Sequence, residues 1–160
     1  MPPHPLPSPV PDRGAAAAAQ RPAGARRLAA LGALGAMPLP VPARPAEARL
    51  LLMAIRIWAA RRRAGADPRC ACAALVGPAA RPLHTLLDSL AAAMGEPLCT
   101  MSARALAVTP DEALVLDLVE HAARSDCEGA RRLLDGLVPG SAAVRLFGHA
   151  ARLALLMPSG

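Results

Sequence analysis

Aromatic residues are almost missing from this sequence of 160 residues, which has one tryptophan, one phenylalanine and no tyrosine. A core with so few rings must bury many smaller side chains, because each aromatic would otherwise remove a large apolar area from water. Alanine carries much of the 54% hydrophobic content. Alanine and leucine suit helices, whereas strands favour β-branched and aromatic residues. The composition therefore predicts an all-α protein.

Lysine and asparagine are also absent, so all 18 basic residues are arginine. This bias is typical of a GC-rich bacterial genome and does not indicate arginine-specific recognition. The net charge of +6 divides into +8 for residues 1–63 and −2 for residues 64–160. A basic balance confined to one part of the chain, with so few aromatic residues for base stacking, argues against nucleic-acid binding.

The sequence also lacks long apolar runs. None reaches the roughly 18–20 residues that span a bilayer, and the best candidate, Leu50–Ala60, is interrupted by Arg56. We therefore expect no membrane-spanning segment and a cytoplasmic protein.

Residues 1–44 are rich in proline, alanine and arginine, and we expect a disordered tail because they cannot bury enough apolar surface to offset their ordering entropy. Within residues 26–46, two arginines and the run LAALGALGAM resemble an export signal, which is the alternative to a cytoplasmic location. A further alternative is that translation starts at Met37. The helical domain is expected over residues 45–157.

The pattern of residues 45–157 predicts a compact bundle of five or six helices joined by short connections. The first helix should begin near Pro45 and is apolar around most of its girth, which is typical of a central core helix. At its carboxyl end, Arg61 and Arg62 complement the helix dipole. Three of its arginines share one narrow stripe, which we expect to face water: Arg49, Arg56 and Arg63.

Cap residues divide the rest of the domain. Asp67-Pro68 predicts the start of a short helix, Arg69–Val76, that Gly77-Pro78 ends. The next helix should run from Pro82 to Met94, with Gly95 as its left-handed terminator.

The strongest local signal is Thr109-Pro110-Asp111-Glu112, a capping box that starts a helix. Ser125 to Glu128 repeats this spacing, and Ser141 is the expected cap of a last helix, Ala142–Met157. The residues of that last helix expected to face the core are Val144, Phe147, Ala151 and Leu155. Those expected to face water are Arg145, His149 and Arg152.

The cysteines do not form a metal-binding pattern. Cys70 and Cys72 are two residues apart, so on a helix they differ by about 200° and cannot face one ion. Cys99 and Cys127 have no close partner in the sequence. We therefore expect no metal site, no cofactor and no disulfide framework.

Asp117 and His121 lie four residues apart on one helix, where a carboxylate can orient a general base. No nucleophile accompanies them, and a solvated ion pair is the simpler interpretation. His84 and His149 belong to no motif. The sequence predicts no catalytic residue.

Two segments resemble a family of short bacterial helical proteins of unknown function, of a high-GC, proteobacterial type. They are ARLLLMAIR at residues 48–56 and TPDEALVL at residues 109–116, and the resemblance extends over residues 46–157. Members often carry a cysteine run before the threonine, whereas this chain has SARALAV there. The resemblance implies a helical fold and no particular activity.

Two functional hypotheses remain. The first is a non-enzymatic helical protein that acts through contacts with an unknown protein partner or through self-association, and it predicts an exposed apolar patch. The alternative is a small enzyme or ligand-binding bundle with a polar pocket between helices, holding His84, Cys99 or His121.

Overall fold

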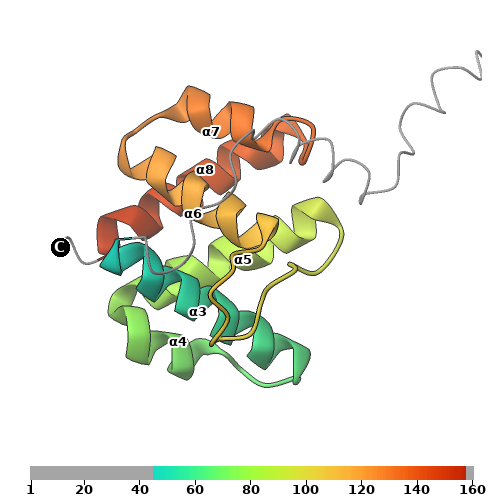
Figure 1. Cartoon of the computed structure of the whole chain (residues 1–160). Helices are drawn as coiled ribbons and strands as arrows, with labels where there is room; N and C mark the ends of the chain where they lie inside the picture. Colours follow the sequence, from blue (N-terminus) through green and yellow to red (C-terminus); the bar gives the residue numbers. More distant parts are fainter. Residues whose placement is uncertain (1–44, 158–160) are drawn as a thin grey trace, which may run out of the picture.

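The computed structural model describes residues 45–157, and this part is built of six α-helices and a 3₁₀ turn without strands (Figure 1). The all-α prediction is confirmed. The predicted tail of residues 1–44, the export signal and the Met37 start lie outside the described residues. The elements are α3 (Ala46–Arg63), α4 (Arg69–Val76), η2 (Gly77–Ala79), α5 (Ala80–Met94), α6 (Pro110–Ala123), α7 (Cys127–Leu134) and α8 (Gly140–Leu156).

The core forms where α8 packs against both α5 and α6, with α3 and α4 covering one side and α7 another (Figure 1). α6 is the most enclosed helix, because nine of its fourteen residues are buried. α3 lies at one side of the core and not at its centre as predicted, and its seven buried residues lie between Leu51 and Ala59. Across residues 45–157, no helix has both the length and the apolar character needed to cross a membrane.

The predicted helix ends fit well in the first half of the domain. α4 spans Arg69–Val76 as predicted, but its cap position is Pro68, one residue after the expected Asp67. Asp67 Oδ1 accepts a hydrogen bond from the Arg69 backbone N–H at 2.9 Å. α5 begins two residues earlier than expected because η2 leads directly into it. Gly95 terminates α5 at a φ of 73°, a left-handed conformation that glycine adopts without a Cβ penalty.

The capping box at the start of α6 is confirmed. Thr109 Oγ1 accepts from the Glu112 backbone N–H at 3.1 Å, and Glu112 Oε2 accepts from the Thr109 N–H at 2.9 Å. Two donors that the first turn would leave unpaired are thereby satisfied.

The two later cap predictions were wrong. Ser125 has a φ of 57° and belongs to the end of α6, so the cap of α7 is Asp126, whose carboxylate accepts from the Gly129 N–H at 2.8 Å. The backbone bonds of Ser125 to Ala122 and of Asp126 to His121 form a Schellman-type helix end there. At α8 the cap position is Pro139, and Ser141 lies inside the helix.

Arg56 corrects the prediction of a solvent-facing arginine stripe. Its side chain is 2% exposed, and its Nε donates to Glu112 Oε1 at 2.8 Å, while its Nη2 donates to Oε2 at 3.0 Å. Arg49 and Arg63 of the same stripe are exposed, as expected. The regular spacing places the three arginines on one line of the helix. The tertiary partner of Arg56, Glu112, is what distinguishes it from the other two.

The Arg56–Glu112 pair also holds the connection between α5 and α6. Arg56 Nη1 donates to the carbonyl of Ala105 at 2.6 Å, and Nη2 donates to that of Ala107. Glu112 Oε1 additionally accepts from the Met101 N–H at 3.0 Å. A long connection without helices or strands thus takes one conformation because buried charged groups bond its backbone.

A second set of bonds closes the base of this connection. Thr109 Oγ1 donates to the Cys99 carbonyl at 2.7 Å, and Asp111 Oδ2 accepts from the Cys99 N–H at 2.6 Å. The side chains of Thr109 and Asp111 are both buried. The two ends of the loop are therefore joined through the first turn of α6.

Removing either partner of the buried pair should destabilise the fold strongly. For Arg56→Met or Glu112→Gln we expect a loss of about 3–5 kcal/mol in the free energy of unfolding, because the other charge stays buried and unpaired. Urea denaturation followed by circular dichroism measures this loss.

The matched control is Glu120→Gln, which breaks the exposed i,i+4 pair of Glu120 with Arg124 and should cost at most about 0.5 kcal/mol. Amide exchange should accelerate across residues 99–109 in Arg56→Met and stay unchanged in the control. Equal losses in the two variants would contradict this role for the buried pair.

Candidate functional site

α8 has two apolar faces, and the predicted core-facing set is only partly right, because Phe147 and Ala151 are partly buried against the core. Its buried residues are Ala142, Leu146, Ala150 and Leu153. The prediction that Val144 and Leu155 face the core is wrong, since these side chains are 75% and 83% exposed. Both sets follow helical spacing, so periodicity alone cannot select between them.

The outer apolar face of α8 forms a straight stripe. Its members follow one another at steps of four, three and four residues, which places them along one line of a helix. Large side chains stand at the two ends and small residues in the middle. We call this set the α8 stripe: Val144, Gly148, Ala151 and Leu155.

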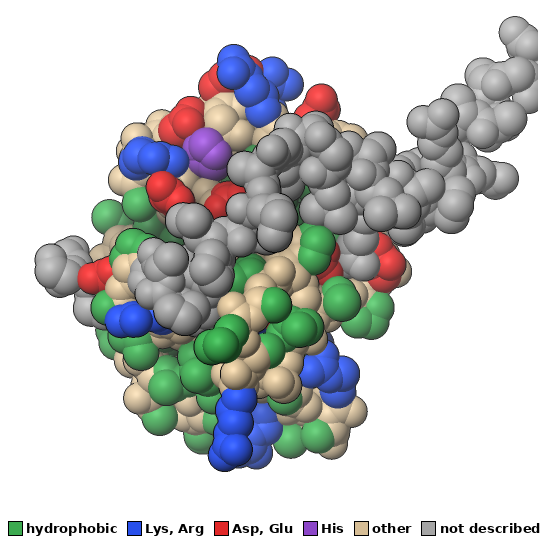
Figure 2. Space-filling view, in the orientation of Figure 1, with side chains coloured by type: hydrophobic (Ala, Val, Ile, Leu, Met, Phe, Trp, Pro, Cys, Tyr) green, Lys and Arg blue, Asp and Glu red, His purple; other side chains and the backbone are tan. Residues whose placement is uncertain are grey.

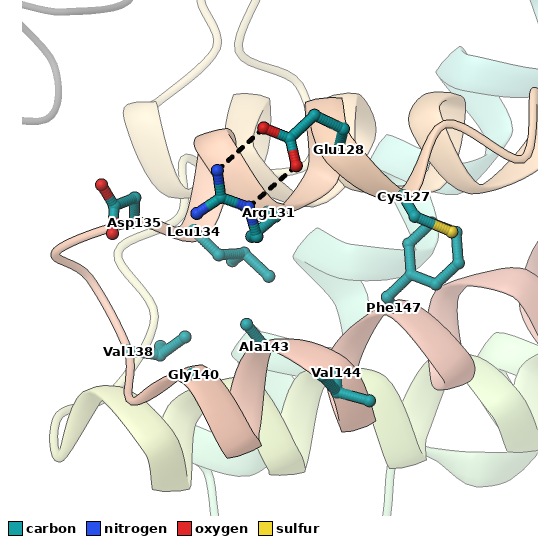
Figure 3. Close-up of a pocket in the computed structure, with 10 residues that line it drawn as sticks. All are labelled: Cys127, Glu128, Arg131, Leu134, Asp135, Val138, Gly140, Ala143, Val144 and Phe147. Atoms are coloured by element: carbon teal, nitrogen blue, oxygen red, sulfur yellow. Dashed lines mark hydrogen bonds and ion pairs between the residues drawn. The ribbon is translucent and has the colours of Figure 1, made fainter.

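A groove runs beside the α8 stripe, between α7 and α8, with a volume of about 460 Å³ (Figure 3). Phe147 and Cys127 line one end of the groove, and Val138 lines the other. Val144 belongs to both the groove and the stripe. The apolar surface is thus continuous from the outer face of α8 to α7.

The rim of the groove on α7 is charged, but its charges neutralise one another. Glu128 accepts from Arg131 at 2.9 and 2.8 Å and from Arg132 at 3.1 Å, and these guanidinium groups lower the pKa of its carboxyl group to about 2. Figure 2 shows basic and acidic side chains side by side at the end of the molecule where α7 lies. The groove therefore carries an apolar floor and a locally balanced rim.

His121 is bonded to a different acid from the one that the sequence suggested. Its Nδ1 lies 2.8 Å from Oδ2 of Asp126, the residue that caps α7, whereas the predicted orienting acid was Asp117 of its own helix. The backbone N–H of Gly129 and His121 lower the pKa of Asp126, because both stabilise its charged form. This contact joins the end of α6 to the start of α7.

Gly129 permits this close approach. A Cβ at this position would overlap the Asp126 carboxylate and the His121 ring. The glycine is therefore required by packing, although glycine inside a helix normally costs stability. The sequence contained no signal for this role beyond the glycine itself.

The cysteines lie apart in the structure. Cys72 is buried, with its Sγ 3.5 Å from the Ala54 carbonyl, and burial raises the pKa of its thiol. Cys70 is exposed, so the two thiols of the C-x-C pair lie on different sides of α4, as their spacing predicts. Cys99 and Cys127 are exposed as free thiols. Among residues 45–157, no group of three or more cysteine, histidine or acidic side chains is arranged to hold a metal ion.

The arginines at the end of α3 take part in structural contacts. Arg62 pairs with Asp88 of α5 at 3.1 Å, and its guanidinium lies 5.8 Å from the centre of the Trp58 ring. Arg63 donates to Thr100 Oγ1 at 3.2 Å. These contacts join α3 to α5 and to the α5–α6 connection.

His84, which no motif singled out, is 9% exposed at the start of α5. Burial lowers the pKa of its imidazole, because removal from water disfavours the charged form. Its Nε2 is buried and has no hydrogen-bond partner among the described residues.

No protein-family model, curated protein or solved structure matches this chain. The resemblance of residues 48–56 and 109–116 to a bacterial family therefore stays a prediction.

Replacing Gly129 with alanine should have the opposite effect from the usual glycine substitution in a helix. We expect Gly129→Ala to lower the free energy of unfolding by about 1–3 kcal/mol, because the added methyl group forces Asp126 and His121 apart. Gly148→Ala is the control, since open space surrounds that position and alanine should stabilise the helix by up to about 1 kcal/mol. Denaturation at low micromolar concentration compares the two variants, and a stabilised Gly129→Ala would contradict the packing role.

Acid should remove the stabilisation that Asp126 and Glu128 give to α7. The pKa values of Asp126 and Glu128 are both lowered in the folded protein, so their stabilisation is complete above the ordinary carboxyl pKa of about 4 and is lost as the pH falls through the folded values. Urea midpoints measured from pH 5 down to pH 2 should fall, and Asp126→Asn should have a lower midpoint at pH 5 but a flatter profile. An equally steep profile in Asp126→Asn would exclude Asp126 as a contributor.

Proposed function

We propose that this chain is a non-enzymatic helical protein that acts through protein contacts, and that its α8 stripe binds a second copy of the chain. The observation that supports this proposal is the exposure of Val144 and Leu155 at 75% and 83% on a helix whose opposite face is already buried. Apolar side chains in a row on an exposed face are typical of interaction surfaces.

The order of residues in the α8 stripe favours a second copy as the occupant. In an antiparallel pair related by a two-fold axis between Gly148 and Ala151, Val144 of one copy lies opposite Leu155 of the other. The small residues then face each other at the centre, where they allow the two helices to approach closely. Such self-complementarity is what a two-fold interface requires.

The expected association is weak. Burying one valine or leucine side chain stabilises a complex by about 1.5–3 kcal/mol, and the pair of helices buries four such side chains. Association itself costs about 4–15 kcal/mol in lost freedom of motion. The balance corresponds to a dimer that forms reversibly as the concentration of the protein rises.

Arginines beside the α8 stripe add a salt dependence. Arg145 and Arg152 lie along one edge of the helix, and the two-fold axis brings like edges together. Arg145 of one copy then comes near Arg152 of the other, and the repulsion between them opposes association. Salt screens such exposed charges, since the screening length falls from about 10 Å at 0.1 M to about 3 Å at 1 M.

The bacterial source and cytoplasmic location belong to this proposal as expectations. The arginine-only basic content supports the first, and the second is the prediction made from the sequence.

Sedimentation velocity over a range of protein concentrations tests the proposal. The wild-type chain should pass from monomer to dimer, and added salt should strengthen the dimer. Val144→Glu and Leu155→Glu should each weaken association at least tenfold, because each would bury a charge in the apolar contact.

Leu106→Glu is the matched control, since Leu106 is 67% exposed in the α5–α6 connection, away from α8. This variant should associate as the wild type does. A monomer at every concentration, or an equal loss of association in Leu106→Glu, would overturn the proposal.

A further inference from the structure

The connection between α5 and α6 is the longest stretch without a helix in residues 45–157, and it lies across α3 (Figure 1). Connections of this length in a compact domain usually have a function or lack a fixed structure. This one has a fixed structure, because the buried pair of Arg56 and Glu112 bonds its backbone. The fold thus uses the backbone of the connection and leaves its exposed side chains for another role.

Two large apolar side chains are exposed on this connection. Leu106 is 67% exposed and Met101 is 38% exposed. Between them, the backbone N–H of Ala105 donates to the Ser102 carbonyl at 3.1 Å and closes a turn. The chain on both sides of the turn bonds to the same ion pair, because the Met101 N–H donates to Glu112 and the Ala105 carbonyl accepts from its partner arginine. The turn therefore holds the two apolar residues on one part of the surface.

The exposed part of the connection is also basic. Residues 99–108 contain no acid. Arg104 lies within the turn and is exposed. Arg63 of α3 donates to Thr100 Oγ1 at 3.2 Å, so a second guanidinium group lies beside the connection. Apolar side chains and positive charge are thus combined on one short segment.

The backbone beside these apolar side chains is already hydrogen-bonded within the protein. The N–H groups of Met101 and Ala105 and the carbonyls of Ala105 and Ala107 all have partners. Unpaired backbone groups oppose contact with an apolar phase, because they would lose their bonds to water there. The connection avoids this penalty at four groups and, being fixed, loses little conformational freedom when it binds.

These features favour a lipid surface over a protein as the partner. A stable protein interface takes about 20–30 residues on each side, whereas residues 99–108 expose two large apolar side chains. A lipid surface needs no complementary shape. It accepts a few inserted apolar side chains, and its acidic headgroups attract arginine.

We propose that residues 99–108 bind the surface of an anionic membrane. Leu106 and Met101 enter the apolar boundary of the lipid layer. Arg104, with Arg63 beside it, contacts the acidic headgroups. The contact is peripheral and does not depend on the α8 stripe, because the stripe and the connection share no residue.

Co-sedimentation of the full chain with lipid vesicles tests this proposal. One set of vesicles contains phosphatidylcholine and phosphatidylglycerol, and the other contains phosphatidylcholine alone. We expect binding to the anionic vesicles that weakens about tenfold in neutral vesicles and also weakens in 1 M salt, because salt screens the headgroup charge. Residues 1–44 also carry a positive net charge, so variants are needed to locate the contact.

Leu106→Glu should weaken binding to anionic vesicles at least tenfold, because it removes an inserted side chain and adds a charge that the headgroups repel. Arg104→Gln should weaken binding several-fold. Val144→Glu is the matched control, since it adds the same charge at an exposed apolar position of α8, and it should bind as the wild type does at concentrations below dimer formation. Absence of binding, equal binding to neutral vesicles, or equal losses in Leu106→Glu and Val144→Glu would each overturn the proposal.

Discussion

The buried ion pair of Arg56 and Glu112 determines how the two halves of this domain fit together. Arg56 lies in the middle of α3 and Glu112 in the first turn of α6, 56 residues apart in the sequence. Neither charge could be buried alone, because removal from water costs each ion several kcal/mol. The pair is tolerated because the guanidinium and the carboxylate also bond the backbone of the connection between α5 and α6. One interaction thus fixes the position of α6 against α3 and the path of the loop between them.

The other ion pairs are exposed and contribute less, although the pair of Arg62 with Asp88 also joins two helices, α3 and α5. The pairs of Arg124 with Glu120 and of Arg131 with Glu128 lie within single helices and are exposed to solvent, where such pairs are worth little. Asp126 is intermediate, since it caps α7 and also bonds His121 at the end of α6. Local pairs support helices that packing already determines, whereas the buried pair selects one arrangement of helices. Charge in this protein therefore has a structural role that its net value does not reveal.

The sequence predicted what depends on neighbouring residues and missed what depends on distant ones. The fold class, the bounds of α4 and the capping box at Thr109 follow from local chemistry, and the structure agrees with them. Arg56 was assigned to a solvent-facing stripe because its spacing from Arg49 and Arg63 is regular, and only α6 distinguishes it from them. Val144 and Leu155 were assigned to the inner face of α8 for the same reason, since both of its apolar stripes have helical spacing. The buried, unpaired Nε2 of His84 could not be foreseen, because its surroundings depend on how the helices pack.

The two segments on which the predicted resemblance rests contain both partners of the buried pair. Arg56 is the last residue of the first segment, residues 48–56, and Glu112 lies within the second, residues 109–116. A chain that keeps these two residues in their helical settings can keep this arrangement of α3 and α6 while its surface changes. Such a pair stabilises the fold and gives no information about activity. Evidence on function must therefore come from groups that the fold leaves unused, and the α8 stripe is one such group in the described residues.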